Sequence, residues 1–359
     1  MRSPAPLKSL SALANAGLIS ATDVAGLEAV AARYAISVTP DMARLIEAQD
    51  PMDPIGRQFL PQIAELTTTA EERADPVGDY AKSPVPGVVH RYPDRVLLKL
   101  THTCAVYCRF CFRREMVGPG GDGDLTGEAL QAALDYIANQ GQIWEVILTG
   151  GDPLVLSNRR LHHVAEALRA MDHVKVLRLH SRAPVADPQR IDAGLISALQ
   201  ASGKAVYLAV HANHAREFSL PARAACARLA EAGIPLLGQT VLLKGVNDTV
   251  EALSALFRTM VETRIKPYYL HHPDLSPGTS HFRLSLEEGQ ALMRGLRGDI
   301  SGLCQPTYVL DIPAGAGKVP VGPNYLSPNY LSPNPGNSDQ DAKVWVEDPF
   351  GERHLYPKS

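Results

Sequence analysis

Short apolar, β-branched runs alternate with amphipathic stretches over the central part of the chain. The runs lie at residues 96–100, 144–148, 174–179, 206–211, 236–243 and 267–270. Helical patterns separate them, and apolar positions between 130 and 137 follow the i, i+3, i+4, i+7 spacing of a helix with one buried face. Six strands that alternate with helices predict parallel βα units.

Reactive side chains recur at or near the carboxyl ends of these predicted strands. In chain order they are Cys104, Cys108 and Cys111, then Gly150, Gly151 and Asp152, then Arg182, His211, Gln239 and Asp274. A doubly wound sheet concentrates its chemistry at one switch point, whereas a barrel spreads it around one rim. We therefore predict the α/β class with a (β/α)6 partial TIM barrel.

Different patterns flank this core, which we place at residues 96–300. Residues 1–95 are punctuated by prolines and predict a helical accessory region packed on the core. Residues 301–359 contain a small-residue segment that ends in Lys318, a duplicated Pro-Asn-Tyr-Leu-Ser stretch at 323–333 and a predicted terminal hairpin. The duplication is too short for a solenoid and predicts an extended loop.

The composition narrows the class of protein. Hydrophobic residues make up 45% and charged residues 20% of the chain, as in ordinary soluble proteins. A net charge of −3 lacks the basic excess of a nucleic-acid binder, and no apolar run has the length of a membrane span. The Ala- and Ser-rich N-terminus is interrupted by polar residues, so we predict an amphipathic helix rather than a targeting segment. We expect a cytoplasmic protein without a nucleic-acid or membrane partner.

Three of the five cysteines form a C-x3-C-x2-C pattern at Cys104, Cys108 and Cys111. An odd cysteine count argues against a disulfide framework and favours a reducing compartment. Three thiolates can hold a [4Fe–4S] cluster and leave one iron free to bind another molecule. A structural zinc ion usually takes four protein ligands, and no fourth ligand follows at finger spacing.

This cysteine loop resembles that of the radical S-adenosylmethionine superfamily. Further matches in order resemble the lysine 2,3-aminomutase family, over about residues 40–325. They lie at 103–114, 148–153, 180–184, 239–248, 266–270 and 317–320. The resemblance implies that the open iron binds S-adenosylmethionine, whose cleavage gives a 5′-deoxyadenosyl radical. It also implies that Gly150, Gly151 and Asp152 form the strip that touches the methionine amine.

The resemblance further implies pyridoxal 5′-phosphate, which stabilises a radical next to the migrating nitrogen. Lys318 matches the Schiff-base lysine, and its small-residue segment lets the chain approach a ring closely. Taken alone, the segment would predict an exposed loop with a solvated lysine. It is not a P-loop, because Val319 stands where a hydroxyl residue is needed. Arg91 and Arg95 match positions that bind the cofactor phosphate, and Gln239 matches a further cofactor contact.

The resemblance assigns the substrate as well. Arg113 matches the residue that grips the α-carboxylate, and an arginine fork suits a carboxylate; Arg114 beside it is a second candidate. Asp274 and Asp311 match the two aspartates that lysine-acting members use for the distal ammonium. Without the family, they would be a turn residue and a strand-end cap. C-terminal zinc-binding cysteines of some members have no counterpart after Cys304.

The expected reaction is interconversion of L-lysine and β-lysine by an isomerase. Alternatives are the same chemistry on a lysine of elongation factor P or on another amino acid, a radical enzyme without pyridoxal phosphate, and a non-catalytic cluster protein. The family further implies a homo-oligomer and an electron donor such as flavodoxin or ferredoxin.

Overall fold

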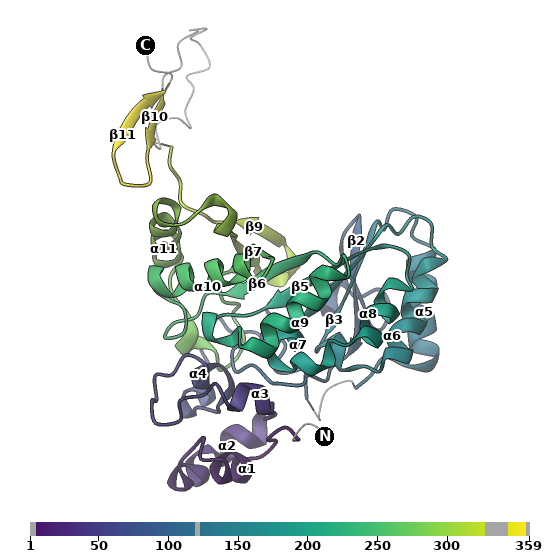
Figure 1. The fold of residues 1–359 in the computed structure, drawn as a ribbon, viewed down its shortest axis with the longest axis horizontal. Helices are drawn as coiled ribbons and strands as arrows, with labels where there is room; N and C mark the ends of the chain where they lie inside the picture. Colours follow the sequence, from purple (N-terminus) through teal and green to yellow (C-terminus); the bar gives the residue numbers. More distant parts are fainter. Residues whose placement is uncertain (1–4, 119–122, 327–343, 357–359) are drawn as a thin grey trace.

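A nine-stranded sheet forms the centre of the molecule in the computed structural model, which describes residues 5–118, 123–326 and 344–356 (Figure 1). Its strands are β1 (Val88–Tyr92), β2 (Arg95–Thr101), β3 (Glu145–Gly150), β4 (Val176–Ser181), β5 (Ala205–His211), β6 (Leu236–Val241), β7 (Ile265–His271), β8 (Thr307–Ile312) and β9 (Gly317–Pro320). Strands β2 to β8 are parallel neighbours in chain order, and β1 and β9 are antiparallel edges. The predicted α/β partial barrel is confirmed, and β8 adds one parallel strand to the six that the sequence pattern predicted.

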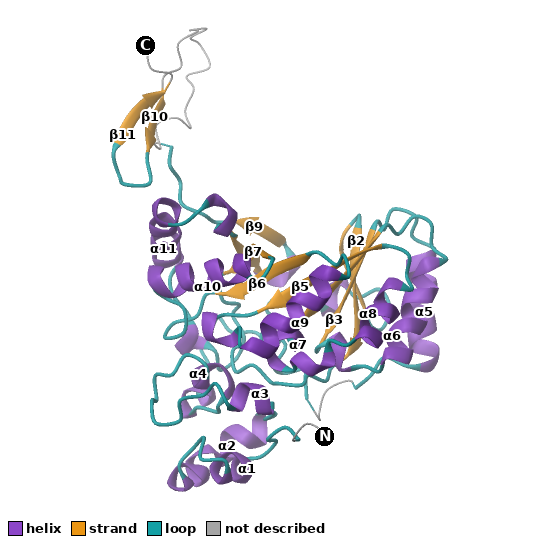
Figure 2. Ribbon diagram, viewed as in Figure 1, coloured by secondary structure: helices purple, strands orange, loops and turns teal. Residues whose placement is uncertain are grey.

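Helices connect the parallel strands (Figure 2). They are α5 (Gly127–Ala138), α6 (Asn158–Arg169), α7 (Ala183–Ala186), α8 (Ala193–Gln200), α9 (Leu220–Glu231), α10 (Val250–Glu262) and α11 (Leu286–Asp299). The predicted apolar face of α5 is buried, and β3 is buried along its whole length. Helix-covered parallel strands lose solvent on both faces, which explains their continuous apolar runs.

The N-terminal region consists mainly of short helices, α1 (Leu10–Asn15), α2 (Val24–Arg33), α3 (Pro40–Ala43) and α4 (Gly56–Phe59). They share a separate apolar core that also takes in Val106 of the cysteine loop and Ala186 of α7. The accessory region therefore packs directly against the loop that carries the cysteines. The region also contains β1, a strand that the sequence pattern did not predict.

Beyond β9 the predicted terminal hairpin is confirmed as β10 (Val344–Glu347) and β11 (Arg353–Tyr356), which pair antiparallel and extend away from the barrel (Figure 1). Of the duplicated stretch, residues 323–326 are described, and the remainder lies outside the described residues. None of the helices within the described ranges has the length and apolar character that a bilayer-spanning segment needs.

Candidate active site

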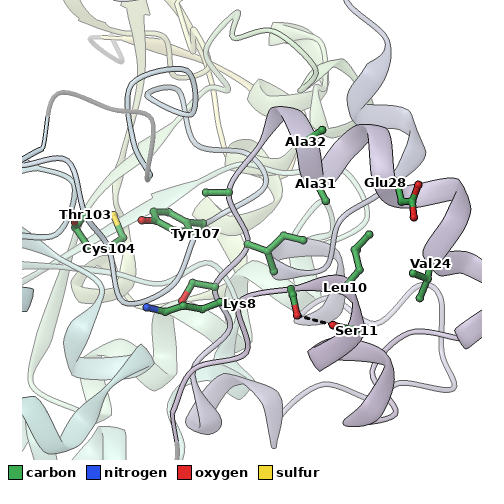
Figure 3. A pocket seen from close by; sticks show the side chains of 14 residues that line it. Lys8, Leu10, Ser11, Val24, Glu28, Ala31, Ala32, Thr103, Cys104 and Tyr107 are labelled. Carbon is green, nitrogen blue, oxygen red and sulfur yellow. Dashed lines mark hydrogen bonds between the residues drawn. The ribbon is translucent and has the colours of Figure 1, made fainter.

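The cysteine loop leaves the carboxyl end of β2 and lies beside the N-terminal helices. Cys104 and Tyr107 line a pocket of about 620 Å³ together with residues of α1 and α2, among them Leu10 and Glu28 (Figure 3). All three cysteines of the loop are free thiols with partial exposure. Burial raises the pKa of each thiol, to about 11 for Cys111. Their ionisation as ligands therefore requires the positive charge of bound iron.

The three thiols of the loop suit a cluster better than a structural zinc ion. A structural zinc site usually takes four protein ligands, whereas three thiolates can hold a four-iron cluster and leave one iron open. Within the described residues, a group of three side chains close enough to hold one metal ion is formed by Asp348, Glu352 and His354 of the exposed hairpin.

The glycine strip after β3 lies against the start of the cysteine loop. The Gly151 N–H donates to the Thr101 carbonyl at 2.6 Å, and the Asp152 N–H donates to the Thr103 carbonyl at 2.9 Å. Gly150 has a φ of +116°, and a Cβ on either glycine would collide with a backbone carbonyl of this segment. The contact explains why two glycines are needed beside the first cysteine.

The carboxylate of Asp152 accepts hydrogen bonds from groups of the protein itself. It accepts hydrogen bonds from Ser181 Oγ at 2.8 Å and from the backbone N–H groups of Arg182 and Ala183 at 2.9 and 3.2 Å. Asp152 thereby ties the loop after β3 to the loop after β4. Its predicted contact with the methionine amine stays a prediction.

Lys318 projects from edge strand β9 into a polar group at the ends of β7 and β8. Its Nζ pairs with the carboxylate of Asp311 and lies 3.1 Å from Nδ1 of His271. Nε2 of His271 is 3.0 Å from Gln239 Nε2, and the Lys318 ammonium lies 5.5 Å from the Tyr269 ring centre. The structure thus brings together three residues that the sequence assigned to the cofactor or substrate, and adds His271 and Tyr269.

The surroundings of Asp274 and Asp311 shift the pKa values of the two carboxyl groups in opposite directions. Burial and the negative charge of Asp311 raise the pKa of Asp274 to about 7. Burial also raises the pKa of Asp311, but the hydrogen bond to His271 and the Lys318 ammonium outweigh it and hold this pKa well below its ordinary range. The positive charges of Lys318 and Arg113 lower the pKa of Asp274, but burial and Asp311 outweigh them.

Arg113 and Arg91 share a buried carboxylate, that of Asp79. Arg113 donates from Nε and Nη2 to Asp79 Oδ2 at 3.1 and 2.9 Å, and Arg91 Nη2 donates to Oδ1 at 3.3 Å. Burial raises the pKa of Asp79, but the Arg113 guanidinium and further cations lower it below its ordinary value. No sequence pattern points to Asp79, because its partners Arg91 and Arg113 lie 12 and 34 residues away.

Arg95 approaches the same region by way of Tyr92. Its guanidinium lies 3.9 Å from the centre of the Tyr92 ring, and it bonds to Asp94 at 2.7 Å. The Tyr92 hydroxyl accepts the backbone N–H of Lys318 at 2.8 Å. The two edges of the sheet, β1 and β9, therefore meet at Tyr92, with Arg95 beside the segment that carries Lys318.

Arg114, the second candidate for the substrate carboxylate, has a different role in the structure. Its guanidinium pairs with the buried carboxylate of Glu65, donates to the carbonyls of Arg109 and Gly278, and stacks on Tyr34. Glu65 belongs to the accessory region, so Arg114 fastens that region to the cysteine loop. Arg113 remains the candidate for the carboxylate.

Several buried nitrogen atoms in this part of the barrel still need partners. Considering only the described residues, Arg91 Nε, His180 Nε2 and His211 Nε2 have none. Burying such atoms without hydrogen bonds is costly, so a polar ligand is expected to satisfy them. Together with the three free thiols of the cysteine loop, they fit a site built for large polar cofactors.

Two family models match the chain, the radical SAM superfamily over residues 98–256 and a lysine-2,3-aminomutase model over residues 293–331. The parallel barrel, the cysteine loop after its first parallel strand and the first of these matches define a radical S-adenosylmethionine enzyme. An L-lysine 2,3-aminomutase of Clostridium subterminale is 43% identical over 291 residues, which cover 81% of this chain and 70% of the relative.

Two less similar relatives are aminomutases for different amino acids. A glutamate 2,3-aminomutase of Clostridioides difficile is 35% identical over 84% of this chain and 70% of its own length. An L-lysine 2,3-aminomutase of Escherichia coli is 35% identical over 80% of this chain and 83% of its own length. The chain belongs to the lysine 2,3-aminomutase family. Its cofactors are a [4Fe–4S] cluster, S-adenosylmethionine and pyridoxal 5′-phosphate.

Proposed function

We propose that the protein is a lysine 2,3-aminomutase that interconverts free L-lysine and β-lysine. The observation that carries the proposal is the pair Asp274 and Asp311, which faces one ammonium, that of Lys318. Lys318 would hold pyridoxal phosphate through its Nζ, which would take its ammonium away from the pair. A substrate with a distal ammonium replaces it, whereas a second carboxylate, as in glutamate, would be repelled.

The other residues act on the remaining groups of the substrate and cofactors. Arg113 offers Nε and Nη2, now bonded to Asp79, to the α-carboxylate. Arg91 and Arg95 hold the cofactor phosphate, Gln239 contacts the cofactor, and Cys104, Cys108 and Cys111 hold the cluster. When bound, these cofactors supply the radical that removes a hydrogen and the electron sink for the migrating nitrogen. The chain itself contributes position and exclusion of water.

Further features of the chain bear on the location of the enzyme, its electron donor and its oligomeric state. Five free cysteines suit a reducing compartment, which supports a cytoplasmic location. The pocket beside Cys104 brings solvent close to the cluster loop, which supports reduction by an external electron donor such as flavodoxin or ferredoxin. We also propose a homo-oligomer, as the family resemblance implies.

An anaerobic turnover assay tests the proposal. Reconstituted protein receives S-adenosylmethionine, pyridoxal phosphate, dithionite and either L-lysine or L-glutamate, and mass spectrometry separates the products. We expect many turnovers to β-lysine and none with glutamate. Cleavage of S-adenosylmethionine without β-lysine refutes free lysine as substrate. Another amino acid and the lysine of elongation factor P are then tested in the same assay.

A further inference from the structure

Arg182 is a buried arginine that none of the proposed roles uses. It follows β4, its side chain is 6% exposed, and its Nη1 donates to Cys108 Sγ at 3.3 Å. In the described part of the chain, Cys108 is the one cysteine of the loop whose sulfur receives a side-chain hydrogen bond. Backbone N–H groups approach the other two, from Asp152 to Cys104 and from Arg113 to Cys111.

A fixed network prevents Arg182 from turning away. Its Nη2 donates to Gln58 Oε1 at 2.6 Å and to Glu217 Oε2 at 2.5 Å, and its guanidinium lies 4.7 Å from the centre of the Phe59 ring. Glu217 is fully buried, and its other oxygen accepts the backbone N–H groups of Asn213 and His214 at 2.8 and 3.0 Å. These contacts hold the Arg182 guanidinium and the Glu217 carboxylate in place beside the Cys108 sulfur.

Hydrogen bonds and charge at the cysteine sulfurs are two of the factors that set the potential of an iron–sulfur cluster. A donor that carries a positive charge stabilises the more negative, reduced cluster more than the oxidised one. A buried carboxylate next to that donor acts in the opposite direction, and low exposure keeps both effects strong.

We propose that Arg182 raises the reduction potential of the cluster through its hydrogen bond to the Cys108 sulfur, and that Glu217 limits this increase by neutralising the guanidinium. Arg182 is thus a positioning residue that acts through the cluster, and Glu217 acts through Arg182. The proposal depends on the cluster and not on which amino acid is the substrate, so it stands or falls separately from the lysine assignment.

The test is a redox titration monitored by electron paramagnetic resonance, in the absence of S-adenosylmethionine and lysine. E217Q keeps Arg182 and removes its counter-charge, so its midpoint potential is expected above that of the wild type. The double variant R182Q/E217Q removes both charges without leaving a buried carboxylate unpaired. Its midpoint is expected below that of E217Q. Equal midpoints for E217Q and the double variant overturn the proposal.

A matched control and a milder variant complete the test. Arg178 lies on β4, the strand that Arg182 follows, and pairs with Glu145 at 3.0 Å. The variant R178Q/E145Q therefore removes a comparable buried ion pair and is expected to leave the midpoint unchanged. If the variants at Glu217 bind no iron, R182K decides, because lysine keeps the charge but cannot reach Cys108 and Glu217 together. A midpoint lowered in R182K supports the proposal, and an unchanged midpoint overturns it.

Discussion

Replacing Asp274 by asparagine removes a carboxylate that the ligand-free protein holds at a cost. Burial and the nearby Asp311 raise its pKa from 3.8 to about 7. The folded protein therefore binds a proton here more tightly than the unfolded chain does. The free energy of unfolding of the protein therefore falls as the pH rises from 3.8 to about 7, and it stays at the lower value above pH 7.

The pKa sets the size of the effect. The difference between 3.8 and about 7 corresponds to about 4 kcal/mol at most. Asp274 keeps some solvent exposure, and screening reduces the effect to an estimated 2 kcal/mol, roughly half. We therefore expect D274N without cofactors to be about 2 kcal/mol more stable than the wild type at pH 8, and equally stable at pH 4.

D311N is the matched control, because it removes the other carboxylate of the pair. The Lys318 ammonium and His271 hold the pKa of Asp311 below its ordinary value, so this carboxylate stabilises the fold above about pH 4. We expect D311N to be less stable than the wild type at pH 8. Both variants should lose about 10- to 100-fold in kcat/KM for lysine, the effect of one charged hydrogen bond.

The assay is urea unfolding of the cofactor-free proteins at pH 4 and pH 8, followed by steady-state kinetics of the reconstituted enzymes. Opposite changes in stability with the same loss of activity are the expected result. If D274N is destabilised at pH 8 as much as D311N, the electrostatic reasoning about the pair is wrong. If D274N keeps full activity on lysine, the carboxylate does not bind the distal ammonium.

Three further outcomes test the remaining assignments. K318A should lose the imine absorption near 400 nm and its reduction by borohydride onto the protein, whereas K266A should keep both. C111A should lose the cluster iron measured by chemical analysis, whereas C226A, a change on α9, should keep it. R113K should raise KM for lysine about 10-fold or more with a smaller change in kcat, because an ammonium cannot replace the bidentate fork; an unchanged KM refutes carboxylate binding by Arg113.

The sequence predicted the parts of the fold that repeat a strong local pattern. Each of the six apolar runs became a parallel strand, and the terminal hairpin formed as expected. Burial on both faces makes such runs long and β-branched, so they stand out from their surroundings. The cysteine loop was equally clear, because three ligands within eight residues are rare without a metal site.

The strands at the edges were not predicted, for a physical reason. In β1, only Val88 and Val89 are buried, and the strand continues into polar residues such as His90 and Arg91. Strand β9 has four residues and includes Gly317 and Pro320, both poor strand formers. Their pairing is imposed by the neighbouring strands β2 and β8, so no local pattern could reveal it.

The contacts that the sequence could not reveal are those that balance charge in the pocket. Arg113 is paired with Asp79, and Lys318 with Asp311. In the proposed binding mode, the carboxylate of lysine replaces Asp79 on Arg113, and its distal ammonium replaces Lys318 on Asp311. Substrate binding then exchanges one ion pair for another at each end, and the displaced Asp79 keeps its pair with Arg91, so no isolated buried charge has to be created. The affinity is a difference between similar pairs, so specificity depends on the distance between the two ends and on the sign of the charge at each. In this binding mode glutamate would fit the first end and be repelled at the second, so a few charged residues would suffice to separate the two activities.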